Sequence, residues 1–156
     1  MSIPLLDALT KYYKHADKAA RNPSIVVPSE LDFVPGPQDD LESVIWVLTY
    51  AIMLHHQETL RRLDKADYKR DVVDQLYGGL SYSGLSKERK LMVFEGSNSL
   101  ANGADEWIPD PTQCKWFRRA MVLVEGQIKP SPHDGRTKDI TFDTFDALCD
   151  EFITDE

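Results

Sequence analysis

The longest apolar run in the chain covers residues 44 to 54, and within it only Thr49 lies outside the aliphatic and aromatic classes. A helix that is apolar on every side is typical of the middle of a protein core, because any exposed face would leave apolar side chains in water. We therefore predict that a helix over about residues 40 to 56 is the most buried element of the fold. Its predicted centre consists of Val44, Val47, Leu48, Ala51 and Ile52.

Shorter amphipathic patterns precede this run. Apolar residues recur every three or four positions over residues 1–20, and Ser2 with a proline two positions later is a typical helix start. Four prolines predict an extended segment over residues 22–38. Asp39 is predicted to cap the central helix, with Glu42 in the position that completes a capping box.

The second half of the chain carries the same helical spacing. It predicts a helix over residues 65–77 and further helices that begin at Ser86, Thr112 and Thr141. A polar loop is expected over residues 102–111. The helix that begins at Thr112 has its apolar face formed by Trp116, Phe117, Ala120, Leu123, Val124 and Ile128.

Together these patterns predict one all-α domain over residues 1–156, with about six helices around a buried central helix. With 156 residues, of which 42% are hydrophobic, the chain is long enough for one substantial core and too short for two. The expected parts are an N-terminal helix over 1–20, an extended proline-rich segment over 22–38 and a helical core over 39–156.

The chain is acidic, with a formal net charge of -8. This charge disfavours nucleic acid and anionic membranes as partners, since both attract basic proteins. The run at 44–54 is too short to span a bilayer, and the charged residues within 1–20 do not fit a secretory signal. Cys114 and Cys149 lack the spacing of metal ligands, so they are expected to be buried, reduced thiols. We therefore expect a cytoplasmic or nuclear protein that is not secreted.

Two segments resemble a known family. M-S-I-P-L-L at residues 1 to 6 and D-D-L-E-S-V-I-W-V-L at residues 39 to 48 are similar to the second half of the fungal-type protein kinases. In that family a D-L-E-S segment opens the long central helix of the C-terminal lobe. S-K-E-R-K-L-M-V-F at residues 86 to 94 is similar in character to a later helix of the same lobe. The resemblance implies a kinase-C-lobe-like fold around the central helix.

The resemblance also implies roles for single residues. Asp40 stands where kinases have an aspartate that binds the backbone of the catalytic loop, and a helix cap is its alternative role. Pro4 stands where most kinases have the glutamate of the A-P-E segment, so the buried salt bridge of that glutamate is not expected. The glycine-rich loop, the phosphate-binding lysine, the catalytic base and the magnesium-binding aspartate of the kinase pattern are absent from the sequence. We therefore expect neither ATP nor another cofactor to bind.

Other patterns do not indicate catalysis. His55 and His56 are adjacent on the predicted helix and point about 100° apart, so they are not expected to share a metal ion. We predict a non-catalytic protein-interaction or regulatory module with a protein partner. The alternatives are an enzyme or small-molecule binder on the same scaffold, and a fragment of a longer fungal kinase. The candidate binding residues are Asp39, Asp40, His55 and Trp107; no catalytic or metal-ligating residue is assigned.

In a whole kinase, one side of the central helix lies under the catalytic loop and the helix before it. That side needs a cover here, because a large apolar face in water is rare in a stable monomer. The apolar stripe of residues 3–20 would provide the cover if this helix folds back. We expect that arrangement and a monomer, with cover by a second chain as the alternative.

Overall fold

The computed structural model describes residues 1–27, 31, 33–59, 81–94, 102–131 and 133–153. Its helices are α1 (Ile3–Arg21), α2 (Pro37–His55), α5 (Tyr82–Phe94), α6 (Ala104–Trp107), α7 (Pro111–Ile128) and α8 (Phe142–Ile153). These described residues contain no strand, which confirms the predicted all-α class. The helix predicted over 65–77 lies outside them.

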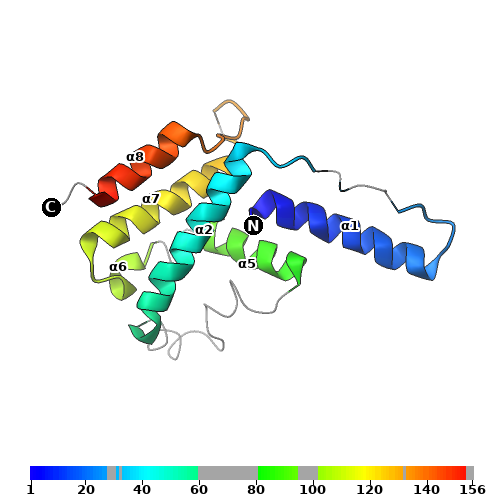
Figure 1. The fold of residues 1–156 in the computed structure, drawn as a ribbon, viewed down its shortest axis with the longest axis horizontal. Coiled ribbons are helices and arrows are strands. Elements are labelled where there is room, and N and C mark those ends of the chain that lie inside the picture. The colour runs from blue at the N-terminus through cyan, green and yellow to red at the C-terminus, as the bar shows by residue number, and fades with distance from the viewer. Residues whose placement is uncertain (28–30, 32, 60–80, 95–101, 132, 154–156) are drawn as a thin grey trace.

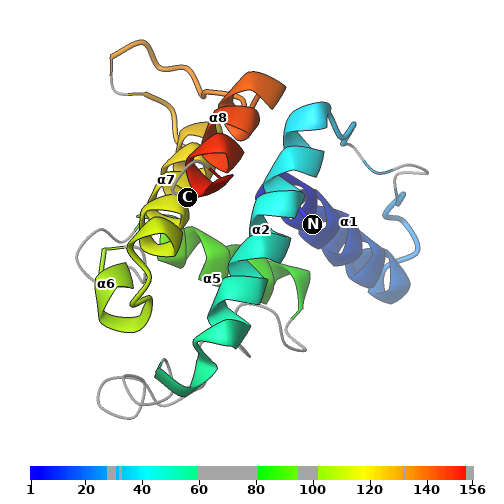
Figure 2. The same cartoon turned by 60° about the vertical axis from the view of Figure 1, so that its left-hand side comes forward.

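α2 runs through the middle of the fold, with α7 and α8 on one side and α1 on the other (Figures 1 and 2). α5 crosses behind α2 and packs against α1 and α7. Every one of these helices contributes to one contiguous core. Its largest fully buried side chains, those less than 2% exposed, are Trp46, Trp107 and Phe117. The described helices therefore share a single core.

The start of α1 is held near α2, and the rest of α1 lies along α5. Ser2 caps the helix as predicted, because its Oγ accepts the Leu5 N–H at 3.3 Å. Ile3 and Leu6 are fully buried. From there α1 packs mainly against α5 and extends away from α7 and α8 (Figure 1). The prediction that residues 3–20 cover the central helix is therefore wrong, because the packing face of α1 contacts mainly α5.

α2 begins earlier than predicted and is capped differently. Gly36 is its N-cap and Pro37 its first residue, a position that tolerates proline because no N–H is needed there. Asp39 therefore lies within the first turn, where its Oδ2 accepts the Gly36 N–H at 2.9 Å. Its Oδ1 accepts the Ser2 hydroxyl, also at 2.9 Å. Asp39 thus closes the first turn of α2 and joins it to the start of α1.

Only one face of α2 is buried, which corrects the prediction of a helix buried on all sides. Three of the five predicted central residues are substantially exposed: Val44 at 43%, Val47 at 64% and Leu48 at 38%. Ala51 is also exposed, and Ile52 is partly buried. The buried face consists instead of Asp39, Leu41, Glu42, Ile45, Trp46, Thr49 and Met53.

The caps of the last two helices agree with the sequence in part. Asp110, rather than Thr112, caps α7: its Oδ1 accepts the N–H groups of Thr112 at 2.8 Å and Gln113 at 3.0 Å. Thr141 caps α8 as predicted, because its Oγ1 accepts the Thr144 N–H at 3.2 Å.

Other details also differ from the prediction. α5 begins at Tyr82 rather than Ser86, and α6 lies within the predicted loop 102–111. Cys114 and Cys149 are free thiols as predicted, although Cys149 is only half-buried. Among the described residues, no helix combines the length and the hydropathy that a membrane span requires.

Candidate functional site

A cavity of about 460 Å³ lies between α2, α7 and α8. α7 contributes Gln113 and Trp116 to its walls, and α8 contributes Cys149. The remaining walls come from α2, and nearly all of the lining surface is apolar. A concave, mostly apolar cavity with a few polar groups is the usual form of a binding site. The lining residues of α2 are Leu48, Ala51, Ile52 and His55.

The polar groups of the cavity gather at the C-terminal end of α2. His56 lies just beyond that end, and its Nε2 is 3.0 Å from Gln113 Oε1. The rings of His55 and His56 meet edge to face, with centroids 4.7 Å apart. The contact between His56 and Gln113 connects α2 to α7 and orients the Gln113 side chain at the cavity wall.

The thiol in the α8 wall is suited to packing rather than to attack. Burial raises the pKa of Cys149, and the carboxylates of Asp146 and Asp150 raise this pKa further. Because the thiolate is the reactive form, Cys149 is a weak nucleophile near neutral pH. Asp146 and Asp150 lie three residues before and one residue after Cys149 on α8, so the acidic side of this helix lies close to the cavity.

An exposed apolar stripe continues the cavity along α2. Val44, Val47 and Leu54 are 43%, 64% and 43% exposed. With Leu48 and Ala51 they recur at spacings of three and four residues, which places them on one side of the helix. Contiguous apolar surface of this kind marks interaction sites on soluble proteins. We call the cavity together with Val44, Val47 and Leu54 the α2 groove.

The structure does not bring the four predicted binding residues together. Asp39 is buried in the first turn of α2, and Asp40 is exposed beside it. His55 lies near the other end of the helix, about 24 Å away at the usual rise of 1.5 Å per residue. Trp107 is a core residue, 1% exposed, whose ring meets that of Phe117 edge to face at 5.0 Å. Of the four, only His55 lines the cavity.

The kinase resemblance assigns a role to Asp40, but Asp40 is not the buried aspartate at the start of α2. Asp40, matched with an aspartate that binds backbone, has an exposed side chain. Its neighbour Asp39 is buried and accepts a backbone N–H from Gly36. The backbone-binding aspartate at the start of α2 is therefore Asp39.

A buried polar cluster around Glu42, which the sequence pattern did not reveal, joins α1, α2 and α7. Its Oε1 accepts the Ile3 N–H at 2.8 Å and the Trp46 Nε1–H at 2.9 Å. Its Oε2 accepts Gln127 Nε2–H at 2.9 Å. Burial raises the pKa of Glu42, although the hydrogen bonds from Ile3 and Trp46 and the nearby Arg89 guanidinium act in the opposite direction. Because the donors belong to the fold itself, this cluster is structural.

The chemistry of the α2 groove is that of a contact surface. In the part of the chain that the structure describes, no three His, Cys, Asp or Glu side chains are placed to hold a metal ion. The cavity presents an imidazole, an amide and a weakly nucleophilic thiol among apolar walls. The site therefore offers apolar shape and a few hydrogen-bonding groups to whatever it binds.

Comparisons with known proteins gave no match: no family model, no curated protein and no solved structure matches this chain. The resemblance to fungal-type kinases therefore rests on the segments at residues 1 to 6, 39 to 48 and 86 to 94.

Proposed function

We propose that this protein is a non-catalytic interaction module whose α2 groove binds an amphipathic helix of a partner protein. The observation that carries the proposal is the continuity between the cavity and the exposed apolar stripe of α2. Residues 44–55 span about 17 Å of helix, which matches about three turns of a bound helix. Grooves of this kind bind helices through apolar side chains at positions i, i+3, i+4 and i+7.

A partner helix accounts for more of the surface than a small molecule does. A small ligand can fill the cavity, but it leaves Val44 and Val47 in water, since neither lines the cavity. A helix along the groove covers these residues and inserts a side chain into the cavity. There it meets Trp116, the kind of large, buried aromatic surface that dominates binding energy at interfaces.

The resemblance to kinases supports the same proposal. D-D-L-E-S lies at the start of α2, and α2 runs through the middle of the fold (Figure 1). In kinases one side of the corresponding helix is covered by the catalytic loop and the helix before it. We propose a kinase-C-lobe-like scaffold on which a partner covers the exposed side of α2. The free thiols fit the expected cytoplasmic or nuclear location, where thiols stay reduced.

A synthetic helical peptide tests the proposal. The peptide has about four turns, leucines at spacings of three and four residues, and glutamine at the polar positions. We expect isothermal titration calorimetry to detect binding, and we expect bound peptide to slow the alkylation of Cys149 by a maleimide. The Val47→Asp variant is expected to bind at least about tenfold more weakly, because an unpaired carboxylate in an apolar contact costs more than about 1.4 kcal/mol.

The matched control is Val122→Asp. Val122 on α7 is 65% exposed, close to the 64% of Val47, but it does not belong to the α2 groove. The same substitution there should leave the affinity unchanged. The proposal is contradicted if the wild-type protein does not bind the peptide, or if the two variants lose affinity equally.

A further inference from the structure

The charges beside the α2 groove limit the class of helix that fits it. α2 and α8, which form two of its walls, contain no lysine or arginine. Asp40 on α2 is exposed, as are Asp143 and Asp146 on α8. These carboxylates, with no basic side chain on either helix, make a negative contribution to the potential along these two walls.

These carboxylates stand where a docked helix would pass. Asp40 lies one turn before Val44, at the N-terminal end of the apolar stripe. Asp146 lies about one turn before Cys149 and is close enough to affect its thiol. The negative side chains therefore border the groove at its N-terminal end and along its α8 wall.

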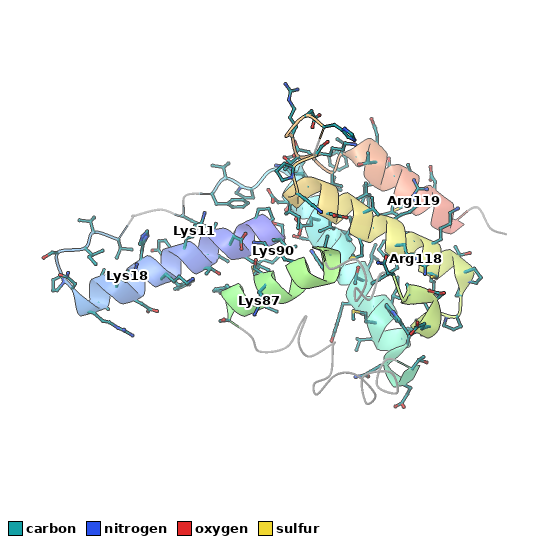
Figure 3. The ribbon with its side chains drawn as sticks, turned by 180° about the vertical axis from the view of Figure 1, so that it is seen from behind. Lys11, Lys18, Lys87, Lys90, Arg118 and Arg119 are labelled. Carbon is teal, nitrogen blue, oxygen red and sulfur yellow. The ribbon has the colours of Figure 1, made fainter. Side chains whose placement is uncertain are left out.

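Most of the basic residues that the structure describes lie outside the three helices that form the cavity wall. Figure 3 shows Lys11 and Lys18 on α1 and Lys87 and Lys90 on α5, helices that do not line the cavity. α7 also carries basic side chains, but Gln113 and Trp116 are its contributions to the cavity wall. Among the described residues, carboxylates thus border the groove on α2 and α8, and the basic side chains of its third wall, α7, are Lys115, Arg118 and Arg119.

We infer that the partner of the α2 groove is a cationic amphipathic helix, with lysine or arginine residues flanking its apolar stripe. This inference rests on the proposed function and adds the charge of the partner. The apolar stripe of such a helix fills the groove, and its basic residues face the carboxylates of α8 and Asp40. Complementary charge of this kind raises the association rate and disfavours acidic helices with the same apolar pattern.

Two further peptides test the inference beside the glutamine peptide. They keep its leucines and carry either lysine or glutamate at the positions that flank them. At low salt we expect the lysine peptide to bind about tenfold more tightly than the glutamate peptide, because several charge pairs each contribute a few tenths of a kcal/mol or more. Near 1 M salt, where the Debye length is about 3 Å, the difference should shrink to about twofold or less.

A pair of charge-reversed variants separates local from overall charge. Asp146→Lys and Asp17→Lys change the net charge of the protein equally, but Asp17 is exposed on α1, away from the groove. We expect Asp146→Lys to remove most of the preference for the lysine peptide and Asp17→Lys to retain most of it. Far-ultraviolet circular dichroism of the two variants checks that both retain the fold.

The outcomes distinguish this inference from the proposed function. If the glutamine peptide binds and the lysine and glutamate peptides bind equally, the groove binds helices but the inferred positive charge of the partner is wrong. Equal effects of Asp146→Lys and Asp17→Lys would overturn the local role of α8. If none of the three peptides binds, the proposed function fails and the inference fails with it.

Discussion

Replacing Ile45 by alanine is expected to lower the free energy of unfolding by about 2–5 kcal/mol, the usual range for a filled core site. Ile45 is 0% exposed on the inner face of α2 and belongs to the core. Leu48, three residues later, is 38% exposed, so Leu48→Ala is expected to cost less than about 1 kcal/mol. Urea denaturation followed by tryptophan fluorescence measures both losses, because Trp46, Trp107 and Trp116 are all buried.

The two substitutions control for each other. Both shorten a four-carbon side chain to the methyl group of alanine in the interior of one helix, so they differ mainly in what surrounds the side chain. A loss at Leu48 as large as the loss at Ile45 would mean that the outer face of α2 is covered in the free protein. That result would contradict the α2 groove as an open binding surface.

The amphipathic helices are the part of the fold that the sequence predicts well. The apolar face predicted for α7 includes Trp116, Phe117, Ala120 and Val124, and all four are buried. The prediction works there because polar residues occupy the opposite face and leave only one way to orient the helix. The start of α1 at Ser2 was predictable for a related reason, since a cap followed closely by proline favours one boundary.

The orientation of α2 was not predictable by the same reasoning. Its residues are apolar on nearly every side, so the pattern does not indicate which face of the helix is buried. The polar residues within it face the core rather than the solvent: Glu42 and Thr49 are both 0% exposed, whereas Val47 is 64% exposed. A buried carboxylate is rare unless specific partners surround it, and those partners come from distant segments. The local pattern therefore predicts correctly that this helix belongs to the core, but it predicts the wrong face as the buried one.

The candidate site was predictable only at one residue. His55 is a predicted binding residue that follows the apolar run, and it does line the cavity. Trp107 is a predicted binding residue in the segment predicted to be a polar loop, yet it lies on α6 and its ring packs in the core against Phe117. The other walls, Trp116 and Cys149, come from helices far apart in the sequence, and their proximity depends on how α7 and α8 pack.

The buried carboxylate of Glu42 is expected to make stability depend on pH. Burial raises its pKa in the folded protein above the ordinary value of 4.5. The folded state therefore holds this proton more firmly than the unfolded chain does. The resulting stabilisation is fully present below about pH 4.5, and it is lost as the pH rises through the raised pKa. Above the raised pKa, folding has to keep a charged group away from water.

Glu42→Gln tests this expectation. The substituted amide oxygen can accept the N–H groups of Ile3 and Trp46. Its NH₂ group can donate to Gln127 Oε1, which has no hydrogen-bond partner among the described residues, once the Gln127 amide turns over and its oxygen takes the place of Nε2. Because the amide does not ionise, the stability of Glu42→Gln relative to wild type should increase as the pH rises from about 4.5 to 8. Urea denaturation at several pH values measures this difference, and Asp40→Asn, at an exposed position of the same helix, is the control. Parallel pH curves for Glu42→Gln and wild type would contradict the raised pKa.

Glu42→Ala is expected to be far more damaging than Glu42→Gln. It leaves the Ile3 N–H, the Trp46 Nε1–H and one amide N–H of Gln127 without their acceptor. A buried donor without a partner costs about 1–3 kcal/mol, so the combined loss should reach about 3 kcal/mol or more. The removed side chain also leaves a cavity where α1, α2 and α7 meet, which adds to the loss. If Glu42→Ala and Glu42→Gln prove equally stable at neutral pH, these hydrogen bonds do not hold the three helices together. In that case the fold tolerates Glu42 without being stabilised by it.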